Sequence, residues 1–272
     1  MFIALDKDNN KISIEQADKN AQYFCPQCGA PLIIKAVDSL AVKAHFAHRK
    51  GSDCDSFSHD MSDWHLDWQK KFPIENREVV IEKDGIKHRA DVCINNTVIE
   101  FQHSPITAEE ISQRNEFYLS CGYNMIWIFD ANDQLKNECG DSIDPVRCRS
   151  GDLCWKRAKR QFAIKMPPKV NVFVEYKTEV SVPQLNGQQV DIMLLLQEVE
   201  PKYLKYYSTQ INTKYYYLLP QYLLKEFGLI EENIPTISAI VNSAIEYQKQ
   251  LARSTPRSRT IYIPRYRRGR RF

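Results

Sequence analysis

Alternating apolar and polar residues in the middle of the chain predict a small sheet with helices packed on it. Residues 77–102 contain short runs rich in valine and isoleucine, separated by the pairs Asp84-Gly85 and Asn95-Asn96. Such pairs favour two-residue hairpin turns, so three consecutive antiparallel strands are expected. Helical spacing precedes and follows these runs, and the apolar run MIWIF comes next. The order helix, three strands, helix, strand over residues 58–138 predicts an α/β fold.

The first predicted helix covers Ser58–Phe72 and carries an apolar stripe that should pack on the sheet. His65 lies at the border of this stripe. The stripe consists of Phe57, Met61, Trp64, Trp68 and Phe72.

The second predicted helix covers Thr107–Ser120, with Thr107 as N-cap and Glu110 three residues later. Arg114 and Tyr118 lie four residues apart and therefore share a face. They are candidate nucleic-acid contacts, since this face could meet a phosphate near the strands. A salt bridge from Arg114 to Glu110 is the simpler account.

The turn at Asn95-Asn96 sets a register that brings two acids together. Pairing the residues that flank the turn places Asp91 opposite Glu100. Because strand side chains alternate, Gln102 is expected on the same side as these acids. The other side is expected to be apolar and to carry Val92, Ile99 and Phe101.

Two carboxylates opposed across a hairpin repel each other unless something cationic lies between them. A divalent ion would remove the conflict, and carboxylate oxygens suit Mg²⁺ or Mn²⁺, which can activate water and bind a phosphate oxygen. The alternative is a solvated hairpin on which Arg89 screens both acids. We favour the metal because Glu100 lies inside an apolar run.

A second candidate metal site lies near the N-terminus. Cys25 and Cys28 form a C-x2-C pair, and His45, His48 and Cys54 follow. In a strand the two histidines would point to opposite faces, so one of these last three is expected not to be a ligand. His48 with Cys54 is a fair second pair, and His45 with His48 stays open. Four protein ligands leave no position for water, so a structural Zn²⁺ is predicted.

The composition excludes the disordered and membrane classes, with 43% hydrophobic and 26% charged residues. The first residues lack the pattern of a secretory signal and no apolar run is long enough for a membrane helix, so a cytoplasmic location is expected. The 8 cysteines are then expected to be reduced, and they are better read as metal ligands or buried side chains than as disulfides.

The net charge of +3 is concentrated at the end of the chain. Residues 253–272 hold eight arginines and no acid, with Arg265, Arg267 and Arg268 beside Tyr262 and Tyr266. Arginine binds phosphate and tyrosine can stack on bases, so this segment is a candidate nucleic-acid contact. A solvated tail without such a role is the alternative.

The motifs resemble known proteins. Asp91 followed by Glu100-Phe101-Gln102 looks like the PD-(D/E)xK nuclease motif, with glutamine in place of lysine. The wider pattern resembles the CoiA-like competence protein family along roughly residues 20–130. It consists of FCPQC, HFAH, a helix with His65, RADV, IEFQHSPI, Arg114, Tyr118 and MIWIF.

The resemblance implies a restriction-endonuclease-like core behind a zinc-ribbon-like segment. Asp91 and Glu100 would bind the catalytic metal, and Gln102 would stand at the position of the catalytic lysine, where it can orient a water but supplies no charge. In some PD-(D/E)xK enzymes the first helix adds a metal ligand, a role open to His65. The alternative for His65 is a histidine at the edge of the core.

These expectations divide the chain into a zinc-binding module (1–57), a nuclease-like core (58–138), an accessory region (139–252) and a basic tail (253–272). The accessory region is expected to be α+β. Its predicted strands are Val170–Val180 and Val190–Val199, and its helices lie near Leu218–Phe227 and Thr236–Leu251.

The predicted function is metal-dependent hydrolysis of phosphodiester bonds, with DNA favoured over RNA, in competence, recombination, repair or defence. The alternative is a nucleic-acid-binding adaptor that keeps the nuclease fold with little or no cleavage, and Gln102 motivates it. A homo-oligomer or a protein partner bound through the accessory region is possible, and no membrane partner is expected.

Overall fold

The computed structural model of the chain describes its N-terminal half in most detail. The described residues are 1–130 without 38, 40–42, 50–53, 55–56 and 58–61, then 135–136, 154–155, 166–178, 190–196, 216–218, 220–231, 246, 249, 250 and 253. Arg265, Arg267 and Arg268 of the tail lie outside the described residues, as does most of the helix expected near Thr236–Leu251.

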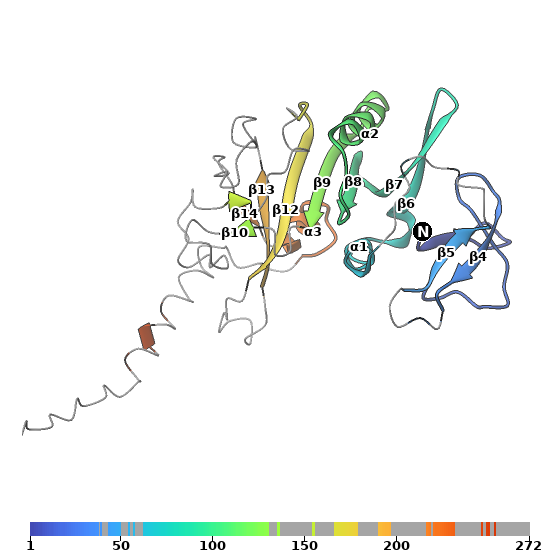
Figure 1. Ribbon diagram of the computed structural model, residues 1–272, viewed down its shortest axis with the longest axis horizontal. Coiled ribbons are helices and arrows are strands. Elements are labelled where there is room, and N and C mark those ends of the chain that lie inside the picture. Colours follow the sequence, from blue (N-terminus) through green and yellow to red (C-terminus); the bar gives the residue numbers. More distant parts are fainter. Residues whose placement is uncertain are drawn as a thin grey trace, which may run out of the picture.

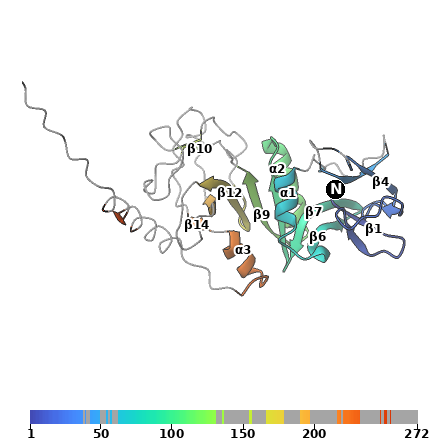
Figure 2. The same ribbon diagram turned by 90° about the horizontal axis from the view of Figure 1, so that it is seen from below.

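The N-terminal part forms a five-stranded antiparallel sheet with the order β2-β1-β3-β4-β5. Its strands are β1 (Ile3–Leu5), β2 (Lys11–Ser13), β3 (Tyr23–Phe24), β4 (Pro31–Lys35) and β5 (His45–His48). Their inward side chains bury a small core that includes Phe2, Tyr23, Leu32 and Phe46. This sheet lies beside β6 and β7 in Figures 1 and 2, away from β12 and β13.

The main sheet has seven strands in the order β14-β13-β12-β9-β8-β7-β6. Strands β6, β7 and β8 form an antiparallel meander, and β9 and β12 continue it in parallel with β8. The strands are β6 (Arg77–Lys83), β7 (Ile86–Ile94), β8 (Thr97–Gln102), β9 (Asn124–Asp130), β12 (Val170–Thr178), β13 (Val190–Leu196) and β14 (Tyr216–Leu218). Two further short strands, β10 (Leu135–Lys136) and β11 (Cys154–Trp155), pair with each other.

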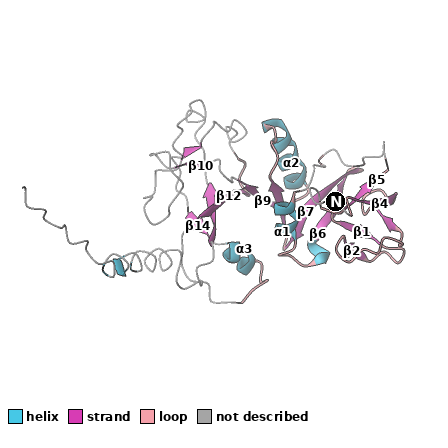
Figure 3. Cartoon of the chain, turned by 60° about the horizontal axis from the view of Figure 1, so that its bottom comes forward, coloured by secondary structure: helices cyan, strands magenta, loops and turns pink. Residues whose placement is uncertain are grey.

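Helices cover both faces of the main sheet (Figure 3). On one face α1 (Asp63–Gln69) and α3 (Pro220–Glu226) share a core with β7, β8 and β9. On the other face α2 (Ala108–Ser120) packs against β9, where Trp127 Nε1 donates to Asn115 Oδ1 at 2.9 Å. A 3-10 turn, η1 (Ile74–Asn76), leads into β6. The first core contains Trp68, Phe72, Val92, Ile99, Phe101, Ile126, Ile128, Phe173 and Leu223.

The predicted hairpin register is confirmed over its first three pairs. Ile94 pairs with Thr97, and the ladder continues through Val92 and Ile99. Asn95 and Asn96 both have positive φ, 45° and 59°, which a type I′ turn requires.

The first helix is shorter than predicted. It begins at Asp63 because Ser62 caps it, with the Ser62 hydroxyl accepting from the His65 amide. Trp64 and Trp68 pack as the predicted stripe requires. Phe57 does not join this stripe. Its ring stacks on the His88 ring, with centroids 3.6 Å apart, and meets the Phe117 ring of α2 edge to face. Met61 lies outside the described residues.

The second helix confirms its predicted cap, since the Thr107 hydroxyl accepts from the Glu110 amide at 3.1 Å. The accessory region contains the two predicted strands and the helix near Leu218–Phe227, as β12, β13 and α3.

The main sheet continues past residue 138, where the sequence suggested a boundary. Strand β12 pairs in parallel with β9 from Val170 to Glu175. Glu175 also binds α1, because the indole N–H groups of Trp64 and Trp68 both donate to its Oε2 at 2.5 Å. Residues 170–178 are therefore built into the main sheet.

The N-terminal sheet is held to the main sheet by buried polar contacts. Glu78 of β6 is fully buried, and its Oε1 accepts the backbone amides of Phe2 and Ile3 at 2.5 and 3.2 Å. Gln27 lies between Cys25 and Cys28, and its Nε2 donates to the Lys87 carbonyl of β7 at 2.9 Å. Leu66 of α1 joins the small core of the N-terminal sheet.

Candidate functional site

Four of the five predicted zinc ligands come together. The ligand atoms of Cys25, Cys28, His48 and Cys54 all lie within 4.8 Å of one another. Cys25 Sγ is 3.6 Å from Cys54 Sγ, and His48 Nε2 is 3.4 Å from Cys28 Sγ and 3.7 Å from Cys54 Sγ. Zn–S bonds of about 2.3 Å give tetrahedral edges of about 3.8 Å. The cluster is compatible with a structural zinc ion.

Local backbone geometry forms this cluster. Gly29 closes the turn after the C-x2-C pair, with φ of 71° and its amide bonded to the Cys25 carbonyl at 2.9 Å. Across the sheet, β5 pairs with β4 and places His48 opposite Leu32. Strand alternation then turns His45 away, and its Nδ1 lies 2.9 Å from the Lys43 carbonyl oxygen. His48 and Cys54 therefore form the second half of the cluster.

The pKa values of the three cysteine thiols in the cluster are shifted in different directions. Burial raises the pKa of Cys25, and burial together with the neighbouring Cys25 raises that of Cys54. Burial also opposes ionisation of Cys28, but the Ala30 amide and the other thiols hold the pKa of Cys28 below its usual value. A cation at the centre would favour the thiolate form of all three.

The second site contains Asp91 in β7 and Glu100 in β8. The Asp91 Oδ2 accepts the backbone amide of Phe101 at 2.9 Å, and Oδ1 lies 2.9 Å from His65 Nε2. Burial opposes the charge of Asp91, but His65, the Phe101 amide and Arg114 hold its pKa below the usual value.

The Glu100 side chain points toward α2, whereas Asp91 lies beside His65 of α1. Its Oε2 accepts from Arg114 Nη1 of α2 at 2.6 Å, while its Oε1 is buried without a hydrogen-bond partner among the described residues. Burial and the charge of Asp91 raise the pKa of Glu100 to about 8, against the opposing effect of Arg114. The half-buried Asp91 carboxylate thus favours ionisation, and the buried Glu100 carboxylate disfavours it.

Asp91 and Glu100 lie on adjacent strands as expected, but they are not a directly paired couple in the β7–β8 ladder. The β7–β8 pairs end at Val92 and Ile99, and the Asp91 side chain takes the Phe101 amide instead. The two carboxylates consequently reach toward different helices. Protein groups lie beside each acid, since His65 neighbours Asp91 and Arg114 neighbours Glu100. Arg89, to which the alternative reading gave this role, has its Nε 3.4 Å from Glu78 Oε2.

Arg114 and Tyr118 do not form a phosphate-binding surface in this structure, because they are only 3% and 0% exposed. The simpler prediction for Arg114 is confirmed, since its Nη2 donates to Glu110 Oε1 at 2.8 Å. The same nitrogen donates to the Phe57 carbonyl at 2.6 Å. Gln102 is also buried, and its Nε2 donates to the Ser104 carbonyl at 2.6 Å.

The sequence did not reveal three buried acids of the main sheet. Glu78 anchors the N-terminal strand, Asp130 binds His103, and Glu175 binds two indoles. Asp130 and Glu175 lie in strands that are mostly apolar, which was the available signal, whereas the strand of Glu78, REVVIEK, is mixed. Their partners lie far away in sequence, so the signal could not be interpreted.

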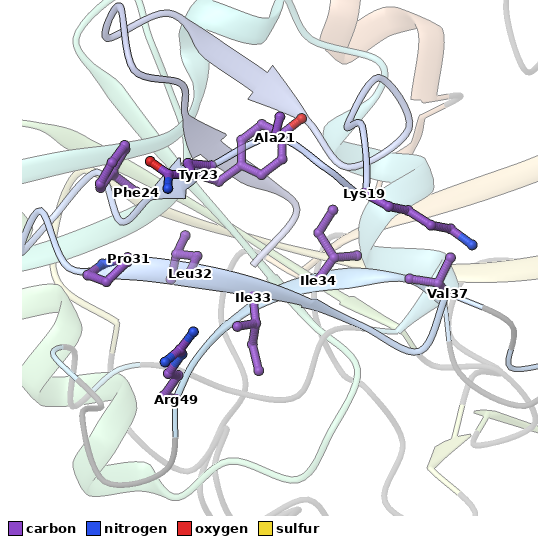
Figure 4. Close-up of a pocket in the computed structure, with 11 residues that line it drawn as sticks. Lys19, Ala21, Tyr23, Phe24, Pro31, Leu32, Ile33, Ile34, Val37 and Arg49 are labelled. Atoms are coloured by element: carbon purple, nitrogen blue, oxygen red, sulfur yellow. The ribbon is translucent and has the colours of Figure 1, made fainter.

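A cavity of about 560 Å³ lies in the N-terminal module, away from Asp91 and Glu100 (Figure 4). It follows β3 and β4, with Leu32 and Ile34 on one side of β4 and Ile33 on the other. Lys19 and Arg49 add charge to its mixed polar and apolar lining. None of the residues that line it belongs to the predicted metal sites.

The fold and sites define an α/β protein whose main sheet carries Asp91 and Glu100 on adjacent strands and whose N-terminal module carries a Cys3His cluster. Family comparison agrees: the model described as "Competence protein CoiA, N-terminal domain" matches residues 6–57, and "Competence protein CoiA, nuclease-like domain" matches residues 66–145. The chain therefore belongs to the CoiA-like competence protein family. No curated protein and no solved structure matched the chain.

Among the described residues, no helix has both the length and the apolar character needed to span a membrane.

Proposed function

We propose that the chain is a metal-dependent nuclease of PD-(D/E)xK type that hydrolyses phosphodiester bonds, with DNA favoured over RNA, in competence-type DNA processing. The order α1, β6, β7, β8, α2, β9 is the arrangement that the resemblance implies for such a core. The observation that carries the proposal is the pair of acids, half-buried Asp91 and buried Glu100, on adjacent strands of a nuclease-like domain.

The donor set fits a divalent cation. Glu100 Oε1 is a buried carboxylate oxygen without a hydrogen-bond partner among the described residues. Such an oxygen is costly to bury unless a cation or a proton meets it. Asp91 and Glu100 would hold Mg²⁺ or Mn²⁺ through oxygen, with His65 as a further ligand or as the group that orients Asp91. When bound, the cation would lower the pKa of a water and polarise the phosphate.

The chain's own residues would position the water and the substrate. Arg114 balances the charge of Glu100 from the α2 side and fixes the direction of its carboxylate. Gln102 stands where lysine is usual, and its Nε2 is committed to the Ser104 carbonyl, which leaves the amide oxygen to accept from a water. Asp91, held by the Phe101 amide, keeps a fixed negative oxygen beside His65.

The Cys3His cluster would hold one structural zinc ion. With four protein ligands there is no open position for water, so the cluster would stabilise the module and not take part in hydrolysis.

The second candidate function is a nucleic-acid-binding adaptor that does not cleave. Two observations favour it. Arg114 already lies 2.6 Å from Glu100, so a protein cation partly takes the place of a metal. Gln102 supplies no positive charge to a phosphate.

Cleavage of labelled single- and double-stranded DNA and RNA, in Mn²⁺, in Mg²⁺ and without added divalent cation, tests the proposal. The variants are Asp91→Asn and Glu100→Gln, which keep the shape and avoid leaving Arg114 opposite an empty space. We expect each to lower the cleavage rate about 100-fold or more while the fold is retained. Glu116→Gln, at an exposed acid of α2, is the matched control and should cleave normally.

The outcomes separate the two functions. Activity that is unchanged in both variants would remove these acids from the site. A parent chain that binds DNA but cuts no substrate under any condition would establish the adaptor.

A further inference from the structure

A histidine–carboxylate pair lies at the end of the main sheet, outside the site described above. His103 directly follows β8, and its Nδ1 lies 2.7 Å from Oδ2 of Asp130, the last residue of β9. The Asp130 side chain is 3% exposed, whereas the His103 side chain is 50% exposed. The pair therefore joins a buried carboxylate to solvent through one imidazole ring.

The hydrogen bond fixes the ring. An ionised carboxylate can only accept, so Nδ1 of His103 donates to Asp130, and the ring cannot turn without losing this bond. Nε2 is the remaining nitrogen, and it has no hydrogen-bond partner among the described residues. A ring held in this way presents one nitrogen in a constant direction for proton transfer.

The surroundings keep Asp130 available to His103. Glu175 pairs with Asp130 in the parallel register of β9 and β12, so two buried acids stand side by side. The indole N–H groups of Trp64 and Trp68 both donate to Glu175 Oε2, whereas Asp130 Oδ2 is bound by His103. The Trp64 ring also lies beside His103, with centroids 6.2 Å apart.

The pair belongs to the same region as the acids of the proposed site. His103 follows Gln102 in the chain, and the Phe101 ring contacts both Trp64 and His65. His65 in turn lies beside Asp91. The carboxyl ends of the parallel strands β8, β9 and β12 meet here, and ligands of α/β sheets bind at such ends.

We propose that His103 is the catalytic proton donor to the leaving oxygen, with Asp130 as its positioning residue; this rests on the proposed phosphodiester hydrolysis. A water oxygen forms the new bond to phosphorus while the bond from phosphorus to the leaving oxygen breaks. In the doubly protonated His103 ring, the Nε2 proton passes to that oxygen while the Nδ1 proton stays on the hydrogen bond to Asp130, and the proton lost by the water goes to solvent. Solvent then restores the proton on Nε2, so the step needs no other reactant.

Leaving-group dependence tests this role. DNA in which sulfur replaces one bridging oxygen, with the 3′- and 5′-bridged forms prepared separately, releases a thiolate that needs no proton. In Mn²⁺ we expect His103→Ala to slow cleavage of ordinary DNA about 100-fold or more, which is the usual range for general acid catalysis. Cleavage of the sulfur-bridged form that the parent accepts should slow less than about threefold. Asp130→Asn should give the same pattern with a smaller loss.

Nitrogen-15 NMR of the histidine rings adds a measurement that needs no cleavage. In the parent chain the neutral form of the His103 ring should carry its proton on Nδ1, the doubly protonated form being the one that donates from Nε2, and the preference for Nδ1 should weaken in Asp130→Asn. Glu116→Gln serves again as the control for both measurements.

Each other outcome overturns the assignment. Equal slowing on oxygen and sulfur substrates would mean that His103 acts in binding or folding, and no slowing would mean that it has no role. A neutral His103 ring with its proton on Nε2 alone would mean that Nδ1 does not donate to Asp130, and this would exclude the proposed orientation of the ring. A parent chain that cuts neither substrate would reject the proposed nuclease itself, and the proton donor with it, which is distinct from loss in the variant alone.

Discussion

At the scale of single residues, the acids of the main sheet differ because their partners differ. Asp91 accepts a backbone amide and neighbours His65, and its pKa is lowered although burial opposes its charge. Glu100 is almost completely buried and feels the charge of Asp91, so its pKa is raised despite Arg114. The same amino-acid chemistry thus gives one stable anion and one acid that readily holds a proton.

The raised pKa of Glu100 predicts how stability changes with pH. An unfolded glutamate titrates near pH 4.3, whereas the pKa of Glu100 in the folded chain is about 8. The folded state therefore holds a proton that the unfolded state has lost. The stability from this group is complete below about pH 4 and is lost as pH rises through about 8. Asp91 has a lowered pKa and acts oppositely, since its contribution is lost only on acidification.

Urea denaturation of the parent and Glu100→Gln at pH 5, 7 and 9, without added divalent cation, measures this effect. Glutamine does not titrate, so the stability of the parent relative to the variant should fall with pH. Each unit of raised pKa corresponds to about 1.4 kcal/mol. A difference that stays constant or grows with pH would contradict the assignment.

At the scale of elements, the N-terminal module is joined to the main sheet by buried contacts. Its core includes Leu66 of α1, and its first strand is bound by Glu78 of β6. The Cys3His cluster lies at the junction, because Gln27 inside the C-x2-C pair donates to both the Cys54 and Lys87 carbonyls. Loss of metal would therefore affect the module and its attachment to β7.

We expect about one zinc ion per chain in protein purified without chelator, measured by elemental analysis. Cys25→Ser and Cys28→Ser should each lose the ion and the order of residues 1–57, because a segment of this size has little apolar core of its own. Cys121→Ser is the matched control, since this half-buried cysteine lies outside the cluster and should leave zinc content unchanged. Metal-free protein with an ordered module would disprove the zinc site.

At the scale of the whole molecule, we propose separate roles for the main sheet and the basic tail. Strand β12 is paired with β9 and belongs to the main sheet. The tail at residues 253–272, of which only Arg253 is described, carries eight arginines and no acid. Its sequence favours contact with the phosphate backbone, and the proposed hydrolytic residues lie elsewhere.

Deleting residues 253–272 should weaken nucleic-acid binding most at low salt and similarly for different sequences. Each phosphate neutralised on duplex DNA adds about 0.9 to the log–log salt slope, so the deletion should flatten the slope by several units. Cleavage at saturating substrate should persist. The control replaces the eight arginines with lysines, which keeps the charge and most of the slope. An unchanged slope after deletion would place the binding surface elsewhere.

The sequence by itself determined the local features of this protein. The asparagine turn, the register from Ile94 to Val92 against β8, and the Thr107 cap depend only on near neighbours in the chain. Strand alternation also separated His45 from His48. These features follow from backbone geometry and short-range hydrogen bonds, which a sequence pattern specifies directly.

Only the tertiary structure decided which side chains neutralise the buried acids. Arg114 reaches Glu100 across two layers, and the indole of Trp64 reaches Glu175 over 111 positions of sequence. The tertiary structure also decided that β12 extends the main sheet beside β9. Burial makes an unpaired charge costly, so each acid must find a partner among whatever residues the packing brings near. That choice depends on the complete arrangement of the layers, which the spacing of residues along the chain does not specify.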